Sequence, residues 1–399
     1  MRPTRMLPIV LLALSAALNA QTSAELGAEK WRQDLAVLAD QLPKLHKNLF
    51  FQQPKAEFDR QVHELDAKLP NLNEGATRAA LVRLLASVGN EHTTIDALRG
   101  TSVFPLQFAI FPEGTYVTAA GPDHQDAIGR RLVSIDGVPV AHVRARLAPY
   151  YAKENAVAEL LFVPGLMRNA VVLNAAGITA SPANATFQFE DAALALDATK
   201  PPVATKGPAG VLARKTADYW YEYKPESKAV YIQYNACRNS KDRSFLDFTN
   251  DLVRAVASKP VSTYIVDLRF NGGGDSKIVQ PLVKALKAAH RTRVFVLVGR
   301  ETFSSAFLAA MELRRECRGT LVGEAMGQRP NSYGDIRPLK LPNSGLTAYY
   351  CTKYFKLSPK DVPQVEPDVP IPLTAADYFA GKDPVLAYAL SAGSPTFLR

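Results

Sequence analysis

The chain has 399 residues, of which 47% are hydrophobic and 21% charged, and its formal net charge is +9. This length and composition predict a globular protein of two or three lobes with a large core. The positive charges form no long Lys/Arg run and do not alternate with aromatic side chains, so we expect no nucleic-acid partner.

Residues 1–20 have the pattern of a secretory signal peptide, because Arg2 and Arg5 precede an apolar run that ends in small residues, with cleavage expected after Ala20. An uncleaved membrane anchor is the alternative, but the apolar run is short for a bilayer and no charged stop follows it. No other stretch is long and apolar enough to span. We therefore expect a periplasmic or secreted protein without a stable membrane span after signal cleavage.

Residues 21–95 are predicted to form a helical lobe, because apolar side chains recur at helical spacing within residues 24–50, 56–69 and 76–88. Gly89-Asn90 then fits a helix C-cap, which puts His92 just past a helix end. On composition alone, a histidine at such a place is a solvated loop residue.

Residues 96–206 are predicted to form a β-rich lobe, in which residues 103–195 read mostly as strands with a hairpin around Pro112-Glu113-Gly114. Residues 129–140 are similar to the strand-turn element of PDZ domains, with Asp136-Gly137 as the turn. PDZ domains bind extended peptides by strand addition, and a purely structural lobe is the open alternative. Residues 182–206 read as a strand edge and a linker.

Residues 207–399 are predicted to form an α/β domain, because two strand–turn–helix units follow one another in it. The strand at 262–268 leads into a glycine turn, residues 271–274, and the strand at 293–298 leads into a serine turn, residues 302–306. Neighbouring parallel strands place both turns at one sheet edge. A glycine turn directs N–H groups at a bound anion, and a helix N-terminus favours negative charge. The two turns are therefore predicted to face one pocket.

Further elements of this domain are expected on either side of the two units. Strands are predicted at 219–223, 228–234, 336–341 and 347–355, and helices at 245–256, 306–315 and 383–390.

The sequence DLRFNGGG, residues 267–274, resembles the Asp-x-Arg-x-Asn-x-Gly-Gly signature of the tail-specific (C-terminal processing) serine protease family, and TFSSA resembles its nucleophile turn. This family includes the tricorn core protease and retinoid-binding-protein-like repeats, and the resemblance spans most of the chain. It implies an α/β fold with a crotonase/ClpP-like ββα catalytic core, and a serine peptidase acting on peptides or unfolded proteins. The tricorn-like branch carries Gly-x-x-His-Thr where this chain has residues 89–93.

The resemblance implies that Ser304 attacks the scissile carbonyl, while His92 accepts its proton and passes it to the leaving amine. Backbone N–H groups of Gly273 and Ser305 would form the oxyanion hole. Ser305 is an alternative nucleophile, and helix N-capping would explain either serine without catalysis.

The remaining residues of the signature, Asp267, Arg269 and Asn271, are interpreted as structural, because charge-assisted hydrogen bonds between them can fix the turn. The three cysteines Cys237, Cys317 and Cys351 make no disulfide framework, although one pair could form in an oxidising compartment. No Cys/His cluster suggests a metal site, and we expect no cofactor.

The sequence departs from the family pattern at three places. Arg329 stands where the Ser-Lys branch has its lysine, and an arginine stays protonated, which excludes that mechanism. Phe307 replaces an acidic residue. The group that would orient the histidine is not identified: Glu91 precedes His92, and the distant candidates are Glu366, Asp361 and Asp335. A non-catalytic peptide- or lipid-binding protein on the same scaffold is therefore the alternative function. Nothing in the sequence indicates the oligomeric state.

Overall fold

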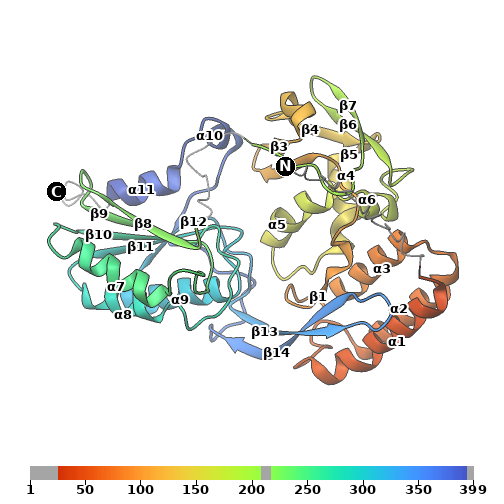
Figure 1. The fold of residues 1–399 in the computed structure, drawn as a ribbon, viewed down its shortest axis with the longest axis horizontal. Helices are drawn as coiled ribbons and strands as arrows, with labels where there is room; N and C mark the ends of the chain where they lie inside the picture. The colour runs from red at the N-terminus through yellow and green to blue at the C-terminus, as the bar shows by residue number, and fades with distance from the viewer. Residues whose placement is uncertain (1–25, 208–216, 393–399) are drawn as a thin grey trace, which may run out of the picture.

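The computed structural model describes residues 26–207 and 217–392. Figure 1 shows them as a sheet domain on the left, a helical lobe at the lower right and a middle lobe at the upper right. The predicted signal peptide lies outside the described ranges. Within those ranges, no helix combines the length and apolar character needed to cross a membrane.

The sheet domain is organised around a six-stranded sheet in the order β15-β12-β11-β10-β9-β8, in which only β8 and β9 are antiparallel. Its strands are β8 (Tyr219–Lys224), β9 (Ala229–Tyr234), β10 (Thr263–Asp267), β11 (Arg293–Val298), β12 (Thr320–Gly323) and β15 (Val369–Pro370). Both faces are buried, as their continuous apolar sequences require. The prediction that β10 and β11 are parallel neighbours is confirmed, so the turns after them leave from the same sheet edge.

Helices cover both faces of this sheet. The helices α7 (Phe245–Val256), α8 (Gln280–Ala288) and α9 (Ser305–Cys317) pack on one face, where Val266 and Val296 point. Helix α11 (Pro384–Ala392), preceded by the short α10 (Ala375–Phe379), packs on the other face against Ile265 and Leu297. The alternation along β10 and β11 thus divides the core into two layers.

The helical lobe contains α1 (Ala28–Leu45), α2 (Lys55–Lys68) and α3 (Glu74–Ala86), in agreement with the three predicted helical stretches. Their apolar faces meet in one core that includes Trp31, Leu38, Phe58 and Leu85, each at most 3% exposed. Gly89 has a φ of +76°, the left-handed conformation expected where the chain leaves α3.

A long hairpin of the C-terminal half crosses to this lobe, as Figure 1 shows beneath the other elements. Its strands are β13 (Asn331–Lys340) and β14 (Thr347–Lys356), and β14 pairs with β1 (Thr94–Ile95) just after the histidine. Leu341 and Ala348 are fully buried in the core of the helical lobe. The buried Asp34 carboxylate of α1 accepts the Asn343 and Ser344 N–H groups at 2.9 and 2.8 Å, which fixes the hairpin tip.

The middle lobe contains two small sheets. The hairpin predicted around residue 113 is β2 (Leu106–Phe111) with β3 (Gly114–Ala120), and the other sheet is β4 (Leu132–Ile135), β5 (Val138–Pro139), β6 (Asn184–Phe189) and β7 (Ala193–Asp197). Asp136 and Gly137 turn between β4 and β5 with φ of 47° and 75°, as predicted for an Asp-Gly turn. Residues 182–206 are more ordered than the predicted edge and linker, since they contain the β6–β7 hairpin.

The prediction of mostly strands over 103–195 is wrong for residues 140–175, which form helices. They are α4 (Val140–Leu147), α5 (Val157–Leu166) and α6 (Ala170–Ala175). Helix α5 packs apolar side chains on several sides, so its sequence shows no single stripe. A short apolar run of this kind reads equally well as a buried strand.

Candidate active site

Ser304 stands at the start of α9, directly after the turn that follows β11. Its φ of 54° and ψ of −124° lie in a region that costs a non-glycine residue about 1–3 kcal/mol. The Ser304 N–H donates to Gln328 Oε1 at 2.6 Å, and Gln328 Nε2 donates to Ser332 Oγ at 2.9 Å, which holds the backbone in place. The Ser304 hydroxyl makes no hydrogen bond to any residue that the structure describes. A strained strand-to-helix turn with a free hydroxyl is the geometry of a serine nucleophile.

Ser305 has a different environment although it is adjacent. Its side chain is buried, and its hydroxyl donates to the Gly274 carbonyl at 2.6 Å. This bond fixes the start of α9 to the glycine turn. Ser305 therefore has a structural partner for its hydroxyl, whereas Ser304 has none among the described residues.

The glycine turn lies directly against the serine turn, as the sequence predicts. A Cβ on Gly273, whose φ is +105°, would lie 2.7 Å from Ser304 Cβ and 2.8 Å from the Ser305 nitrogen. The Gly273 N–H donates to Asn271 Oδ1 at 2.9 Å, and Asn271 Nδ2 donates to the Tyr234 carbonyl at 2.9 Å. Only a residue without a side chain fits at Gly273, because the approach is closer than a Cβ permits.

The charged residues of the signature form ion pairs at the end of β10, just before the glycine turn. Arg269 Nη2 lies 2.6 Å from Asp267 Oδ2 and 2.8 Å from Asp383 Oδ2, and all three side chains are nearly buried. Arg269 thereby connects the end of β10 to the start of α11. This agrees with the interpretation of Asp267, Arg269 and Asn271 as structural residues.

His92 lies beside the serine turn. Its ring stacks on Phe303, the residue before Ser304, with 4.4 Å between ring centroids and 23° between planes. The ring is 8% exposed, and neither ring nitrogen has a hydrogen-bond partner among the described residues. Burial lowers the His92 pKa to about 4, so the imidazole is neutral near neutral pH. The structure thus places the His92 ring against the residue that precedes Ser304.

A buried carboxyl group of the middle lobe, which the sequence analysis missed, holds the histidine loop, residues 88–93. Glu154 Oε1 accepts from Asn90 Nδ2 at 2.6 Å and from the Glu91 N–H at 3.0 Å. The adjacent Asn155 donates to the Met326 carbonyl at 3.1 Å, in the segment that carries Gln328. Residues 154–155 therefore connect the histidine loop to the segment that holds Ser304. Two adjacent polar residues before an apolar helix were the only sequence signal.

None of the candidate orienting groups binds the His92 ring. Burial, reinforced by the Glu154 charge, raises the Glu91 pKa to about 9, and both Glu91 oxygens lack a partner among the described residues. Asp361 pairs with Arg329 at 3.0 Å, Asp335 accepts from Thr352 at 2.8 Å, and Glu366 is exposed. Phe307, at the place of the family's acidic residue, is fully buried in the sheet-domain core.

The three cysteines are free thiols. Cys351 donates to Asn90 Oδ1 at 3.0 Å and Cys237 to Asn271 Oδ1 at 3.6 Å, so the two buried thiols support the histidine loop and the glycine turn respectively.

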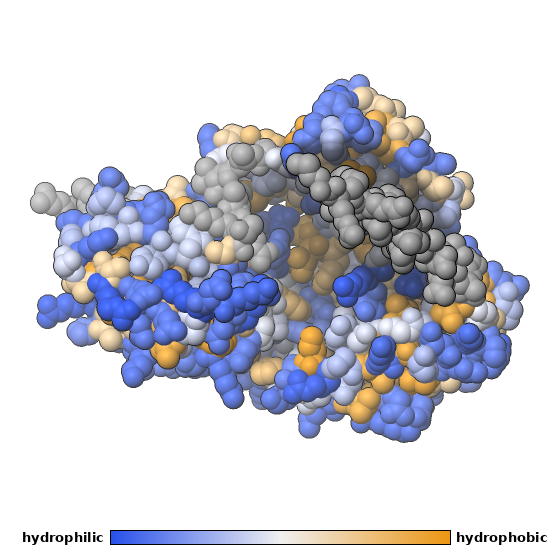
Figure 2. Space-filling model, in the orientation of Figure 1, coloured by the Kyte–Doolittle hydropathy of each residue, from blue (hydrophilic) through white to orange (hydrophobic). Residues whose placement is uncertain are grey.

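A cavity of about 380 Å³ opens at the same sheet edge, between the sheet domain and the middle lobe. Figure 2 shows a hollow between these parts of the molecule. Much of the lining is apolar, from Phe108, Leu160, Leu161, Pro164, Phe270 and Leu373. Its charged groups are Glu301 and two ion pairs, Arg300 with Glu324 and Arg269 with Asp383, each at 2.8 Å.

No model of a protein family matches the chain, and no curated protein sequence matches it. Its structure does match solved structures. For mature CPAF complexed with lactacystin, the TM-score is 0.62 at 12% identity, over 93% of this chain and 98% of that chain. The chain has the fold of CPAF.

A second structure of mature CPAF gives a TM-score of 0.61 at 12% identity, over 93% of this chain and 97% of that chain. The photosystem II D1 C-terminal processing protease matches with a TM-score of 0.42 at 13% identity, over 92% of this chain and 98% of that chain. At 12% identity, the likeness to CPAF is one of fold.

Proposed function

We propose that this chain is a secreted or periplasmic serine endopeptidase that uses Ser304 as nucleophile and His92 as general base. The proposal is carried by the stacking of His92 on Phe303, beside a strained Ser304 whose hydroxyl has no hydrogen bond to any described residue. The signal-peptide pattern of residues 1–20 supports the location. A crotonase/ClpP-like core and a PDZ-like middle lobe belong to the same proposal and rest on the sequence resemblance.

In the proposed reaction, Ser304 Oγ bonds to the scissile carbonyl carbon as its proton passes to the neutral His92 imidazole. The oxyanion meets backbone N–H groups of Gly273 and Ser305. The Gly273 N–H also donates to Asn271 Oδ1, so it would be shared between two acceptors. Ser305 is the first residue of α9, where N–H groups have no acceptor within the helix. His92 then protonates the leaving amine, and water repeats the sequence on the acyl-enzyme.

The 380 Å³ cavity beside the glycine turn is the proposed place for a substrate side chain. Its aromatic and aliphatic lining favours an apolar side chain, because a charged one would lose its hydration without gaining a free partner.

A non-catalytic peptide- or lipid-binding protein is the second candidate, and the observation that favours it is the absence of an orienting group on His92 among the described residues. An unoriented imidazole makes a poor proton relay. An active-site serine probe separates the two candidates. Labelling that disappears in Ser304→Ala supports the peptidase, whereas no labelling together with saturable peptide binding supports the binding protein.

The decisive experiment measures cleavage of a peptide library by the purified chain and three variants. Ser304→Ala and His92→Gln should each lose the activity while circular dichroism shows an intact fold. Ser305→Ala is the matched control, and it should retain measurable cleavage because its hydroxyl only ties α9 to Gly274. Equal rates for the wild type and Ser304→Ala would overturn the proposal.

A further inference from the structure

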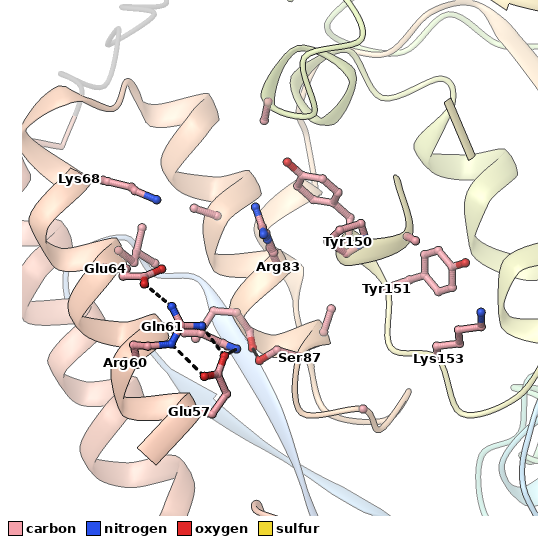
Figure 3. A pocket seen from close by; sticks show the side chains of 18 of the residues that line it. Glu57, Arg60, Gln61, Glu64, Lys68, Arg83, Ser87, Tyr150, Tyr151 and Lys153 are labelled. Atoms are coloured by element: carbon pink, nitrogen blue, oxygen red, sulfur yellow. Dashed lines mark hydrogen bonds and ion pairs between the residues drawn. The ribbon is translucent and has the colours of Figure 1, made fainter. Parts of the chain in front are cut away.

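A second and larger cavity, of about 740 Å³, lies between the helical lobe and the middle lobe. Its walls come from α2, α3 and a short 3₁₀ helix, residues 148–150, with the loop that follows it (Figure 3). We call it the interlobe groove. Its size falls within the range of pockets that bind drug-sized ligands, about 300–1,000 Å³.

The described lining of the interlobe groove has an excess of positive charge. It contains the carboxylates Glu57 and Glu64 and the cations Arg60, Lys68, Arg83 and Lys153. Both carboxylates are already paired with Arg60, as the dashed lines in Figure 3 show. Lys68, Arg83 and Lys153 make no ion pair with any residue in the described part of the chain. The groove therefore offers free cations with no anion of its own to satisfy them.

The free donors converge on one part of the groove. Figure 3 shows Arg83 of α3 and Tyr150 facing one another, with Lys68 of α2 reaching towards the same space. Tyr150 is 7% exposed, and its hydroxyl has no hydrogen-bond partner among the described residues. A guanidinium fork beside a phenol hydroxyl suits one carboxylate, and the Lys68 ammonium group across the groove suits another.

The rest of the lining suits a peptide better than a small inorganic anion. The lining also contains aliphatic residues, namely Leu65, Leu72, Ala76, Ala80 and Leu84. They would pack against the methylene groups of acidic side chains, and the volume is far larger than a single phosphate requires.

We propose that the interlobe groove binds an acidic peptide segment, with its side-chain carboxylates on Arg83, Lys68 and the Tyr150 hydroxyl. The site lies beside the histidine loop, because Ser87 and Gly89 line it and Lys153 precedes Glu154. A bound segment contacts both chain segments that meet at the Glu154 hydrogen bonds. The binding does not depend on whether the chain is a peptidase.

The test uses the full chain carrying Ser304→Ala, so that no cleavage consumes the probe. The probe is a fluorescein-labelled, glutamate-rich peptide with an amidated C-terminus, followed by anisotropy, and its glutamine counterpart is the control peptide. The glutamate peptide should bind at least about ten-fold more tightly, and its binding should weaken as salt rises.

Arg83→Gln and Lys68→Gln, both at exposed positions, should each weaken binding by about ten-fold. Arg291→Gln removes the same charge from an exposed arginine of the sheet domain and should leave the affinity unchanged. Equal affinities for the two peptides, or an equal loss in all three variants, would overturn the proposal. Displacement of the peptide by inorganic phosphate at matched ionic strength would also overturn it, by showing a plain anion site.

Discussion

Ser304 combines a costly backbone conformation with a hydroxyl that has no structural partner among the described residues. Its φ and ψ are those that glycine tolerates and alanine does not. The Gln328 bond and the helix that follows maintain the conformation. Strain held at one residue by its surroundings is typical of functional sites, which is why this residue and not Ser305 carries the proposed chemistry.

This strain predicts a stability difference between two inactive variants. Ser304→Gly should be more stable than Ser304→Ala by about 1 kcal/mol, because glycine relieves the strained φ and ψ. The gain is partly offset by the greater freedom of glycine in the unfolded chain. Chemical denaturation of the two proteins measures the difference. An alanine variant at least as stable as the glycine variant would show that the turn is relaxed.

Glu91 gives a second prediction, from its raised pKa. Its folded pKa of about 9 exceeds the ordinary value of 4.5, so the folded state holds a proton that the unfolded state releases. The free energy of unfolding of the wild type should therefore fall as the pH rises from about 4.5 to about 9. Glu91→Gln removes the effect, and should stabilise the protein by a few kcal/mol near pH 8 but hardly at all near pH 5.

Thermal unfolding across this pH range measures the effect of Glu91→Gln. The matched control is Glu226→Gln, at an exposed position of the sheet domain without a partner among the described residues. It should follow the wild type at every pH. A pH-independent difference between Glu91→Gln and the wild type would show that the Glu91 carboxyl titrates normally.

Among the elements, the loop between the 3₁₀ helix at 148–150 and α5 binds both segments of the candidate site. Glu154 accepts two hydrogen bonds from the histidine loop, and Asn155 binds the segment that carries Gln328. One short loop thereby positions both halves of the candidate pair. It touches neither reacting atom, so Glu154 is a positioning residue.

Glu154→Ala should lower kcat by about ten-fold or more with little change in KM, because the histidine loop loses its acceptor. The buried Glu91 N–H is left without an acceptor, and the Asn90 amide keeps only the Tyr333 carbonyl at 3.3 Å, which also costs about 1–3 kcal/mol of stability. The amide oxygen of Glu154→Gln can accept the same two hydrogen bonds, so this variant should restore most of both losses. Hydrogen exchange at residues 90–93 reports the loop directly. A Gln variant as impaired as the Ala variant would contradict this role.

The spacing of apolar residues along the chain was sufficient to predict some helices and strands but not others. The bounds predicted for α7 and β11 match those observed, because an amphipathic helix and a buried strand before a turn have distinct periods. Helices α4 to α6 were missed because their apolar residues form no single stripe. The contact of His92 with Phe303 has no local signature, since it joins segments far apart in the chain. Family resemblance alone pointed to it.

At the scale of the whole molecule, the helical lobe and the sheet domain are interlocked through the β13–β14 hairpin. Leu341 and Ala348 lie between β12 and β15 of the sheet domain in sequence but are buried with α1, α2 and α3. Neither the core of the helical lobe nor the pairing of β1 is complete without them. The stability of the helical lobe therefore depends on a hairpin that lies far from it in the sequence.

Leu341→Ala tests this interlocking. The substitution should cost about 2–5 kcal/mol, and the loss of hydrogen-exchange protection should appear in α1 to α3. Leu313→Ala, at an equally buried position in α9, is the matched control. It should lower hydrogen-exchange protection in the sheet domain instead. Loss of protection in the sheet domain alone for Leu341→Ala would show that the hairpin belongs energetically to its own domain.

The hairpin also determines when during synthesis the pair can form. A ribosome completes the imidazole segment early and the hydroxyl segment much later, yet β1 finds its pairing partner only once β14 has emerged. A nascent or prematurely terminated chain that stops after Ser304 but before Ala348 thus carries both side chains of the candidate pair and lacks the residues that pair with β1. Such a fragment has no framework to align the two side chains, so under the proposed function it would not be an active peptidase.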